Sequence, residues 1–467
     1  MITHITHLRR TSTMTTRFFA RAALLSAVGL GACSHVLDTS PYDRVPADQQ
    51  IVDASTAQAA LNGAYAALES TSQYGLDIEL LGDMPSDNAS WGGTYQFLAD
   101  VTKNVITADN PEVTNMWIGL YRQIDRDNVI ITRVPQLTGV PASTANEIMG
   151  EAYFLRALSY HNLVKFWGDV PMPVAPVANA ADAAKYTRAP ALQVYTQILS
   201  DLDNAAKLIA NKSNTRLATT TAVSALRARV LFYRAGLAGN TSGAADYAAA
   251  LTAANGVLAG RDTLTVAFGD LFTATGANTS EDIFRVAFTA SQANSLGYYW
   301  LQAGRHEARV TSGLYNTFES GDLRKAVTTT PRSSGSTTYQ GNKFPTTAGT
   351  EHPHVIRLAE LVLIKAEVLA RQNDLAGAVA EYNKVRVRAG LKAHVLGTDV
   401  KTQSDVLAAI LKERRVELAL EGDRWPDLVR LGLAGSVKSL AKPGYTLFPI
   451  PLRDITTTPG MTQNPGY

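Results

Sequence analysis

Two stretches of the 467-residue chain carry aromatic rings close to amide, carboxylate and guanidinium groups. The first stretch holds Asp83, Asp87, Asn88, Trp91, Tyr95 and Gln96. The second holds Asn294, Tyr298, Tyr299, Trp300, Gln302 and Arg305. A rigid aromatic face offers contact area at little entropic cost, and a pyranose presents a C–H face that such a ring can cover while polar groups bind its hydroxyls. These residues therefore predict a surface for sugar recognition.

Eight of these residues are the predicted ligand contacts: Asp87, Asn88, Trp91, Tyr95, Tyr298, Tyr299, Trp300 and Arg305. Core packing of Trp91 is an equal alternative to ligand contact. If Tyr298 and Tyr299 lie on a strand, they face opposite sides and cannot both contact one ligand. Tyr339, in a loop rich in Ser, Thr and Gly, is a further candidate.

A rival chemistry is glycoside hydrolysis, which needs two carboxylates on either side of the scissile bond. Asp83 with Asp87, or Asp201 with Asp203, could supply such a pair, although solvated or capping carboxylates are the better interpretation. Zinc-protease, serine-hydrolase and nucleotide-binding motifs are missing from the sequence. His352 and His354 have no further residues at metal-ligand spacing. We therefore predict a binding protein without catalytic residues, metal or cofactor.

The first 32 residues have the layout of a secretory signal. Arg17 and Arg21 precede an apolar run, Ala22–Leu30, which is shorter than the roughly 20 residues that span a bilayer. The end of this run, Leu30–Cys33, resembles the lipobox of bacterial lipoproteins, in which the cysteine is acylated. Cys33 is the only cysteine, so no intramolecular disulfide is possible. We expect a signal at 1–32, a lipid on Cys33 and a tether at 33–50; an ordinary signal with an incidental cysteine is the alternative.

Charge argues against a nucleic-acid partner. The formal net charge is +2, charged residues make up 18% of the chain, and no block of like charges occurs. A protein that binds nucleic acid normally shows a basic patch or stripe. The balanced charge is more typical of a protein that binds neutral polar ligands.

Apolar residues recur at helical spacing along most of the mature chain. Helices are predicted at Thr56–Ser70, Pro111–Arg133, Ile148–Lys165, Leu192–Ile209, Ala222–Ala235, Ala245–Leu258, Ile356–Arg371 and Leu375–Ala389. The last six form three pairs, and small residues in the first helix of each pair allow close approach. Repeated helical hairpins of this kind resemble tetratricopeptide units. The predicted fold is mainly α: one domain at 51–467, with irregular insertions at about 74–107 and 261–353 and short strands near Ile283–Phe288.

Several segments, taken in order, resemble one known family. They are Glu151–Tyr160, Phe166–Pro171, Arg357–Glu360, Lys365–Glu367, Asn383–Arg386, Arg388–Leu391, Glu413–Leu418, Glu421–Trp425, Asp427–Leu428, Pro449–Pro451 and Gln463–Tyr467. This ordered set resembles the SusD/RagB family of outer-membrane nutrient-binding lipoproteins, from the lipobox to the last residue.

The resemblance implies a surface lipoprotein of the outer membrane, built on four tetratricopeptide-like helix pairs. It also implies that the protein captures a glycan, or a peptide, and delivers it to a SusC-like TonB-dependent transporter barrel without chemistry on the ligand. We interpret the segments at 413–428 and 449–467 as framework, with Trp425, Phe166 and Trp167 packed between helices. An envelope scaffold without a small ligand is the remaining alternative.

Overall fold

The computed structural model describes residues 51–467, apart from 212, 262 and 277. The predicted signal, the lipid site at Cys33 and the tether lie outside the described residues. Within the described part, Ile51–Tyr467 forms a single unit.

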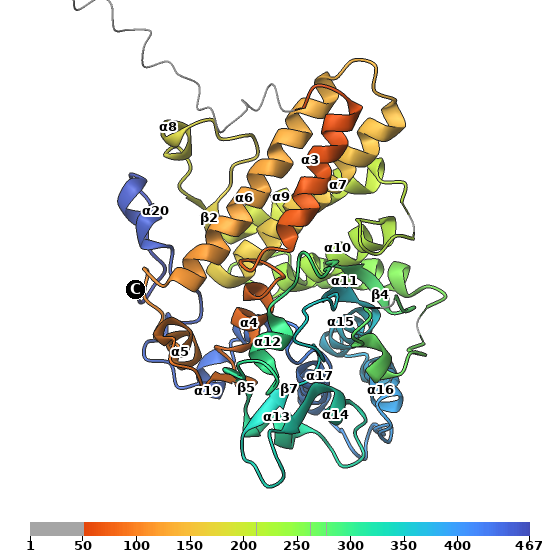
Figure 1. The fold of residues 1–467 in the computed structure, drawn as a ribbon. Helices are drawn as coiled ribbons and strands as arrows, with labels where there is room; N and C mark the ends of the chain where they lie inside the picture. Colours follow the sequence, from red (N-terminus) through yellow and green to blue (C-terminus); the bar gives the residue numbers. More distant parts are fainter. Residues whose placement is uncertain (1–50, 212, 262, 277) are drawn as a thin grey trace, which may run out of the picture. The chain divides into compact units, whose positions relative to one another are not determined.

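Four pairs of packed helices build the scaffold of the described residues. The pairs are α3 (Ala54–Leu68) with α6 (Pro111–Arg133), α7 (Ala142–Trp167) with α9 (Ala191–Leu208), α10 (Thr220–Ala235) with α11 (Gly243–Leu258), and α15 (Leu358–Arg371) with α16 (Leu375–Arg388). Each pair also packs on the next: in Figure 1 the first two pairs lie side by side at the top, α10 and α11 lie below them, and α15 and α16 lie lower still. The three predicted pairs are confirmed, and the fold is mainly α and tetratricopeptide-like.

Local sequence explains why these helices begin and pack where they do. The Asp53 side chain accepts a hydrogen bond from the Thr56 backbone N–H and forms a capping box at the start of α3. Asn110 caps α6 directly before Pro111, whose missing N–H costs nothing at the first helical position. Alanines at the helix contacts, such as Ala157 and Ala228, are fully buried and keep the backbones close.

Further helices, most of them shorter, complete the described part of the chain. They are α4 (Asp77–Asp83), α5 (Gln96–Lys103), α8 (Ala180–Ala183), α12 (Leu296–Trp300), α13 (Ser312–Thr317), α14 (Arg324–Thr328), α17 (Gln403–Glu417), α18 (Arg424–Arg430), α19 (Ala434–Val437) and α20 (Leu452–Thr457), with 3-10 turns η1 (Val134–Gln136) and η2 (Phe268–Leu271). None of the described helices is both long and apolar enough to cross a membrane.

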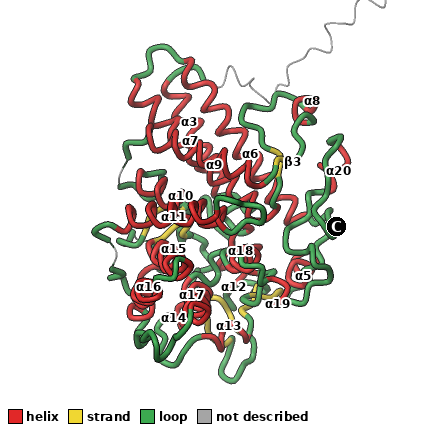
Figure 2. Tube along the Cα trace, turned by 180° about the vertical axis from the view of Figure 1, so that it is seen from behind, coloured by secondary structure: helices red, strands yellow, loops and turns green. Residues whose placement is uncertain are grey.

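The described strands are short and form three antiparallel sheets. The largest has the order β1 (Ala89–Trp91), β5 (Ala308–Val310), β7 (Tyr339–Gly341), β6 (Thr329–Pro331). The others pair β2 (Val170–Pro171) with β3 (Arg188–Ala189), and β4 (Asp282–Arg285) with β8 (His354–Arg357). Figures 1 and 2 place the four-stranded sheet with α12–α14 at the end of the molecule that carries α16 and α17.

The structure differs from the sequence-based expectation in places; for example, α7 begins at Ala142, six residues before the predicted start at Ile148. The helix predicted from Ile356 begins at Leu358, because Ile356 pairs with Phe284 in the β8–β4 sheet. The segment 74–107 is more regular than predicted, since it contains α4, β1 and α5. For Ile356 and for β1, pairing with a distant segment, which local periodicity does not report, sets the secondary structure.

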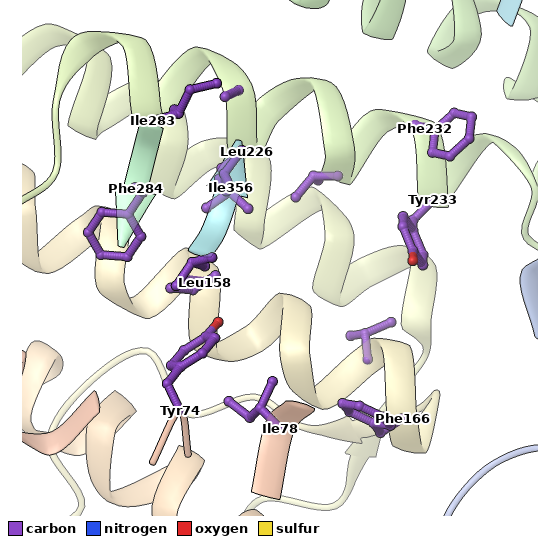
Figure 3. Close-up of a cluster of buried hydrophobic side chains, with 14 of the residues drawn as sticks. Tyr74, Ile78, Leu158, Phe166, Leu226, Phe232, Tyr233, Ile283, Phe284 and Ile356 are labelled. Atoms are coloured by element: carbon purple, nitrogen blue, oxygen red, sulfur yellow. The ribbon is translucent and has the colours of Figure 1, made fainter. Parts of the chain in front are cut away.

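The hydrophobic core lies between the helix pairs and the β4–β8 sheet. Figure 3 shows Leu158 of α7, Leu226 of α10 and Ile356 of β8 gathered beside Ile283 and Phe284 of β4, and all five side chains are buried. The Phe284 ring also meets Phe154 edge to face, with ring centroids 5.0 Å apart. The strands therefore close the core between α7 and α10.

A buried ion-pair cluster joins α17 to the segments around it. Glu417 lies against Arg324, Arg357 and Arg388, and Arg324 also pairs with Glu413 at 2.9 Å. These side chains are at most 3% exposed. The cluster gives the segment 413–428 the framework role that the sequence predicted.

One buried carboxyl gives a pH-dependent prediction. Burial raises the pKa of Glu151 to about 7, against a hydrogen bond from the Tyr65 hydroxyl that lowers it. The folded state therefore prefers protonated Glu151, so stability rises as the pH falls from above 7 toward the unfolded value of about 4.3. In the wild type, the free energy of unfolding should therefore increase between pH 7.5 and pH 5.0. Glu151→Gln should make this increase smaller by an amount on the order of 2 kcal/mol, measured by urea unfolding at both pH values.

Asp109→Asn is the matched control, because the Asp109 carboxylate is exposed. It should leave the pH dependence of the wild type unchanged. If the free energy of unfolding increased by the same amount in Glu151→Gln and in the wild type, the assignment to Glu151 would be contradicted.

Candidate functional site

The two insertions that carry the predicted ligand contacts lie side by side. Strand β1, from the first insertion, pairs with β5 from the second, with Trp91 opposite Ala308. The ladder continues past β1, since the Gly92 N–H donates to the Glu307 carbonyl at 2.7 Å. Residues more than 200 positions apart in sequence are thereby brought to one surface.

Three aromatic rings meet at this junction. Trp91 and Tyr299 have ring centroids 5.9 Å apart, and Tyr299 contacts Tyr298 edge to face at 5.7 Å. Tyr298 is 45% exposed, while Trp91 and Tyr299 are half-buried against the core. We call Trp91, Tyr298 and Tyr299 the aromatic patch. It combines one open ring face with two rings held in place by packing.

Helical geometry explains the different fates of three consecutive aromatics. Tyr298, Tyr299 and Trp300 lie on α12, where neighbours are turned by about 100°. Tyr298 points outward, Tyr299 lies at the boundary, and Trp300 is fully buried, next to Gly341 of β7. The prediction that Trp300 contacts a ligand is therefore corrected: its ring belongs to the core. The strand considered for these residues is a helix, which allows both tyrosines to border one surface.

Polar groups surround the patch. Tyr95 is 39% exposed and donates a hydrogen bond from its hydroxyl to Glu112 at 2.9 Å. Partial burial and this bond raise the pKa of Tyr95 to about 12, which keeps the phenol neutral. The Arg305 N–H donates to the Tyr298 carbonyl at 2.7 Å, and its guanidinium pairs with Glu307 at 2.7 Å. Hydroxyl, carboxylate and guanidinium groups are thus available beside the rings.

The remaining polar residues of the first insertion fasten it to the framework. Asp87 pairs with Arg424 at 2.8 Å and Arg415 at 3.0 Å, and these charges hold its pKa below the usual value in spite of burial. Asn88 is fully buried, donates to Asp83 and accepts from Arg415. The prediction that Asn88 contacts a ligand is corrected, and Asp87 is already engaged by two arginines. Both position β1, which carries Trp91.

The carboxylate pairs considered for hydrolysis are likewise engaged. Asp83 is buried and accepts from Asn88 and from the Gly422 N–H. Asp201 accepts two hydrogen bonds from Arg156, and Asp203 pairs with Arg227 at 2.6 Å. Asp201 and Asp203 are thus members of structural ion pairs, and Asp83 is held by neutral hydrogen-bond donors.

Tyr339 and the two histidines also have structural partners. Tyr339 is 9% exposed and stacks on Tyr315 with ring centroids 4.0 Å apart. His354 contacts Asp282 at 2.9 Å, and His352 Nδ1 accepts from the Phe288 N–H. Each of these side chains is explained by its neighbours.

Sequence reasoning missed Glu112, Glu307 and the glycines after Trp91. A β-carbon at Gly92 would lie 2.0 Å from Arg309 Cζ, so a side chain there would displace the Arg309 guanidinium from the edge of β1. The alternation Arg305, Glu307, Arg309 was a usable strand signal, whereas Glu112 lies in the middle of a helical pattern and carried none.

The fold and this surface define a class: a binding protein on a helical-repeat scaffold, with an aromatic patch made by two insertions. Comparison with known proteins is more specific. Residues 36–232 match the family described as "Starch-binding associating with outer membrane", and residues 297–444 match the "SusD family". The SusD-like protein P2 of Formosa agariphila is 25% identical over 95% of this chain and 98% of its own. The chain belongs to the SusD/RagB family.

Other relatives agree with this assignment. The starch-binding protein SusD of Bacteroides thetaiotaomicron is 34% identical over 24% of this chain and 21% of its own. A SusD homolog from the same organism has a TM-score of 0.79 at 19% identity over 92% of this chain and 100% of its own. A laminarin-binding SusD-like protein has a TM-score of 0.76 at 24% identity over 89% of this chain and 100% of its own. The structural matches establish the shared fold.

Proposed function

We propose that this protein captures a glycan on the aromatic patch and delivers it, unmodified, to a SusC-like TonB-dependent transporter barrel in the outer membrane. The observation that carries the proposal is the meeting of Trp91 with Tyr298 and Tyr299 across two insertions. One exposed and two half-buried rings beside neutral hydroxyls and a guanidinium suit a sugar face with its ring of hydroxyl groups.

The proposed location follows from the sequence and the family. Lipid on Cys33 would anchor the chain, and residues 33–50 would hold the helical body away from the membrane on the outer side. The family is described as associating with the outer membrane. Relatives are named for binding starch and laminarin, which supports a glycan rather than a peptide as the ligand.

Loss of a ring should weaken binding strongly. Trp91→Ala and Tyr299→Ala should each weaken glycan binding by about 2 kcal/mol, roughly thirtyfold in Kd, because each removes an aromatic anchor and the support of its neighbour. Calorimetric titration of the purified protein against a panel of polysaccharides measures this. Starch, laminarin and dextran, each tested for turnover, form the core of the panel.

Tyr186→Ala is the matched control, because Tyr186 is a half-buried tyrosine in the loop after α8, outside the two insertions. It should bind as the wild type does. Turnover of any polymer would favour the hydrolase alternative, and co-purification of a barrel protein without glycan binding would favour the scaffold. Binding that persists in both patch variants would move the site elsewhere.

A further inference from the structure

The outer face of the four-stranded sheet carries a row of polar side chains. Burial alternates along β5 and β7, so that Arg309 and Gln340 face outward between buried neighbours. Ser90 lies opposite Arg309, and Thr330 lies opposite Gln340. Because Val310 pairs with Tyr339 in an antiparallel ladder, Arg309 is also opposite Gln340. One polar residue from each strand therefore forms a continuous row.

This row reaches the edge of the sheet at Gly92, whereas Trp91 lies opposite Ala308 and therefore points to the other face. Arg309 lies so close to the backbone of β1 that its Nη2 donates to the Gly92 carbonyl at 3.3 Å. Glu307, one alternation before Arg309, lies under Gly93 and pairs with Arg305. Because β1 is the edge strand of the sheet, a ligand that contacts both Trp91 and Arg309 would pass over this edge.

Two guanidiniums on this face lack an acidic partner. Among the described residues, no carboxylate lies within ion-pair distance of Arg309 or of Arg332, which follows β6 and is exposed. The backbone N–H of Arg332 donates to the Thr338 carbonyl, which extends the β6–β7 ladder and puts Arg332 on the same side as Thr330. Arginines inside the framework, such as Arg324 and Arg357, all have carboxylate partners.

His306 lies close enough to Arg309 and Arg332 for their positive charges to affect its pKa. Burial lowers the pKa of its ring, and the charges of Arg309 and Arg332 lower it further. Its backbone has φ of 49°, a strained conformation for a side-chain-bearing residue, and its carbonyl accepts from Arg309 Nε. Strain of this kind is common where a site needs a fixed geometry. With Glu307 paired to Arg305, the two positive charges of Arg309 and Arg332 are not offset by an ion pair.

We propose that this outer face binds the acidic groups of an anionic polysaccharide, whose neighbouring sugars pass over the edge strand β1 to the aromatic patch. Arg309 and Arg332 stand two strands apart and two residues out of register, about 12 Å at the usual spacings, which suits charges repeated along a chain better than one isolated anion. Guanidinium groups bind carboxylate and sulfate oxygens through charge-assisted hydrogen bonds. The inference rests on the proposed glycan-binding function and names the class of glycan.

Matched polymer pairs test the inference on the purified full chain by calorimetry. Polygalacturonate and its methyl-esterified form differ in carboxylate charge, and dextran sulfate and dextran differ in sulfate charge. In at least one pair the acidic member should bind at least about tenfold more tightly than its neutral counterpart, and higher salt should weaken that binding. The pair that shows the preference distinguishes a carboxylate ligand from a sulfate ester.

Substitutions then locate the preference. Arg332→Gln alters an exposed side chain and should weaken acidic-polymer binding by about tenfold; Arg309→Gln should do the same. Arg453→Gln, an exposed arginine on α20, is the control and should leave binding unchanged. Thermal melting of each variant shows that the fold is retained.

Four other binding results would each decide between the anionic face and the aromatic patch. Equal binding of acidic and neutral members, lost in Trp91→Ala, would overturn the anionic class and leave the proposed glycan binding intact. Acidic binding that both arginine variants retain would also overturn it. If no polymer of either pair binds, the inference is overturned at this face. Acidic binding lost in the arginine variants but kept in Trp91→Ala would support the anion face and contradict the aromatic patch.

Discussion

Replacement of Glu417 by glutamine should lower the free energy of unfolding by about 3–5 kcal/mol, which is the usual cost of breaking a buried ion pair on one side. Glu417 accepts from Arg357 Nη1 at 2.6 Å and from Arg324 Nη1 at 3.2 Å, and it also pairs with Arg388. The substitution leaves three nearly buried guanidiniums without this carboxylate. Urea unfolding at pH 7, followed by circular dichroism, measures the change.

The same carboxylate predicts an acid limit to stability. Burial opposes its charge, but Arg388, Arg357 and Arg324 outweigh that effect and hold the pKa of Glu417 well below its usual value. Its contribution is therefore fully present above the unfolded value of about 4.3 and is lost as the pH falls toward the lower folded value. The difference between the wild type and Glu417→Gln should shrink steadily below pH 4.

Asp203→Asn is the matched control, because the pair with Arg227 lies at the surface and is worth at most about 1 kcal/mol. If Glu417→Gln cost no more than this control, the buried cluster would not be what holds α17 in place.

The framework was predictable from the sequence to a large degree. Helical periodicity identified α7, α9, α10 and α11, because their buried faces repeat along continuous segments. The charged segment 413–428 was also assigned to the framework correctly. Its partners were not predictable, since Arg324 and Arg357 reach Glu417 from segments 60 or more residues away. Spacing within one helix does not report such contacts.

The candidate site was predictable only as two regions. Trp91 and Tyr299 were both proposed, but nothing local indicated that they would meet, because β1–β5 pairing joins them across more than 200 residues. The same pairing buries Asn88, whose side-chain oxygen accepts a hydrogen bond from Arg415. Residue type indicated the chemistry, and long-range packing decided which residues are free to perform it.

Trp300→Ala should lower stability by about 3–5 kcal/mol, although Trp300 is separated from the exposed Tyr298 by a single residue. Its ring is fully buried, with Gly341 of β7 against one side, so its loss leaves a cavity under the sheet. Trp300→Phe is the matched variant. The indole N–H has no hydrogen-bond partner among the described residues, so phenylalanine removes volume without breaking a bond and should cost less than half as much.

Measurements of glycan binding should distinguish the role of Trp91 from that of Trp300. Trp91→Ala should weaken glycan binding with a smaller loss of stability, because Trp91 is only half-buried. Trp300→Phe should bind as the wild type does, since the aromatic patch is untouched. Stability is measured by urea unfolding and binding by calorimetry on the same preparations. If Trp300→Phe were fully stable but failed to bind, Trp300 would be a ligand contact after all, and α12 would have to turn in solution to expose it.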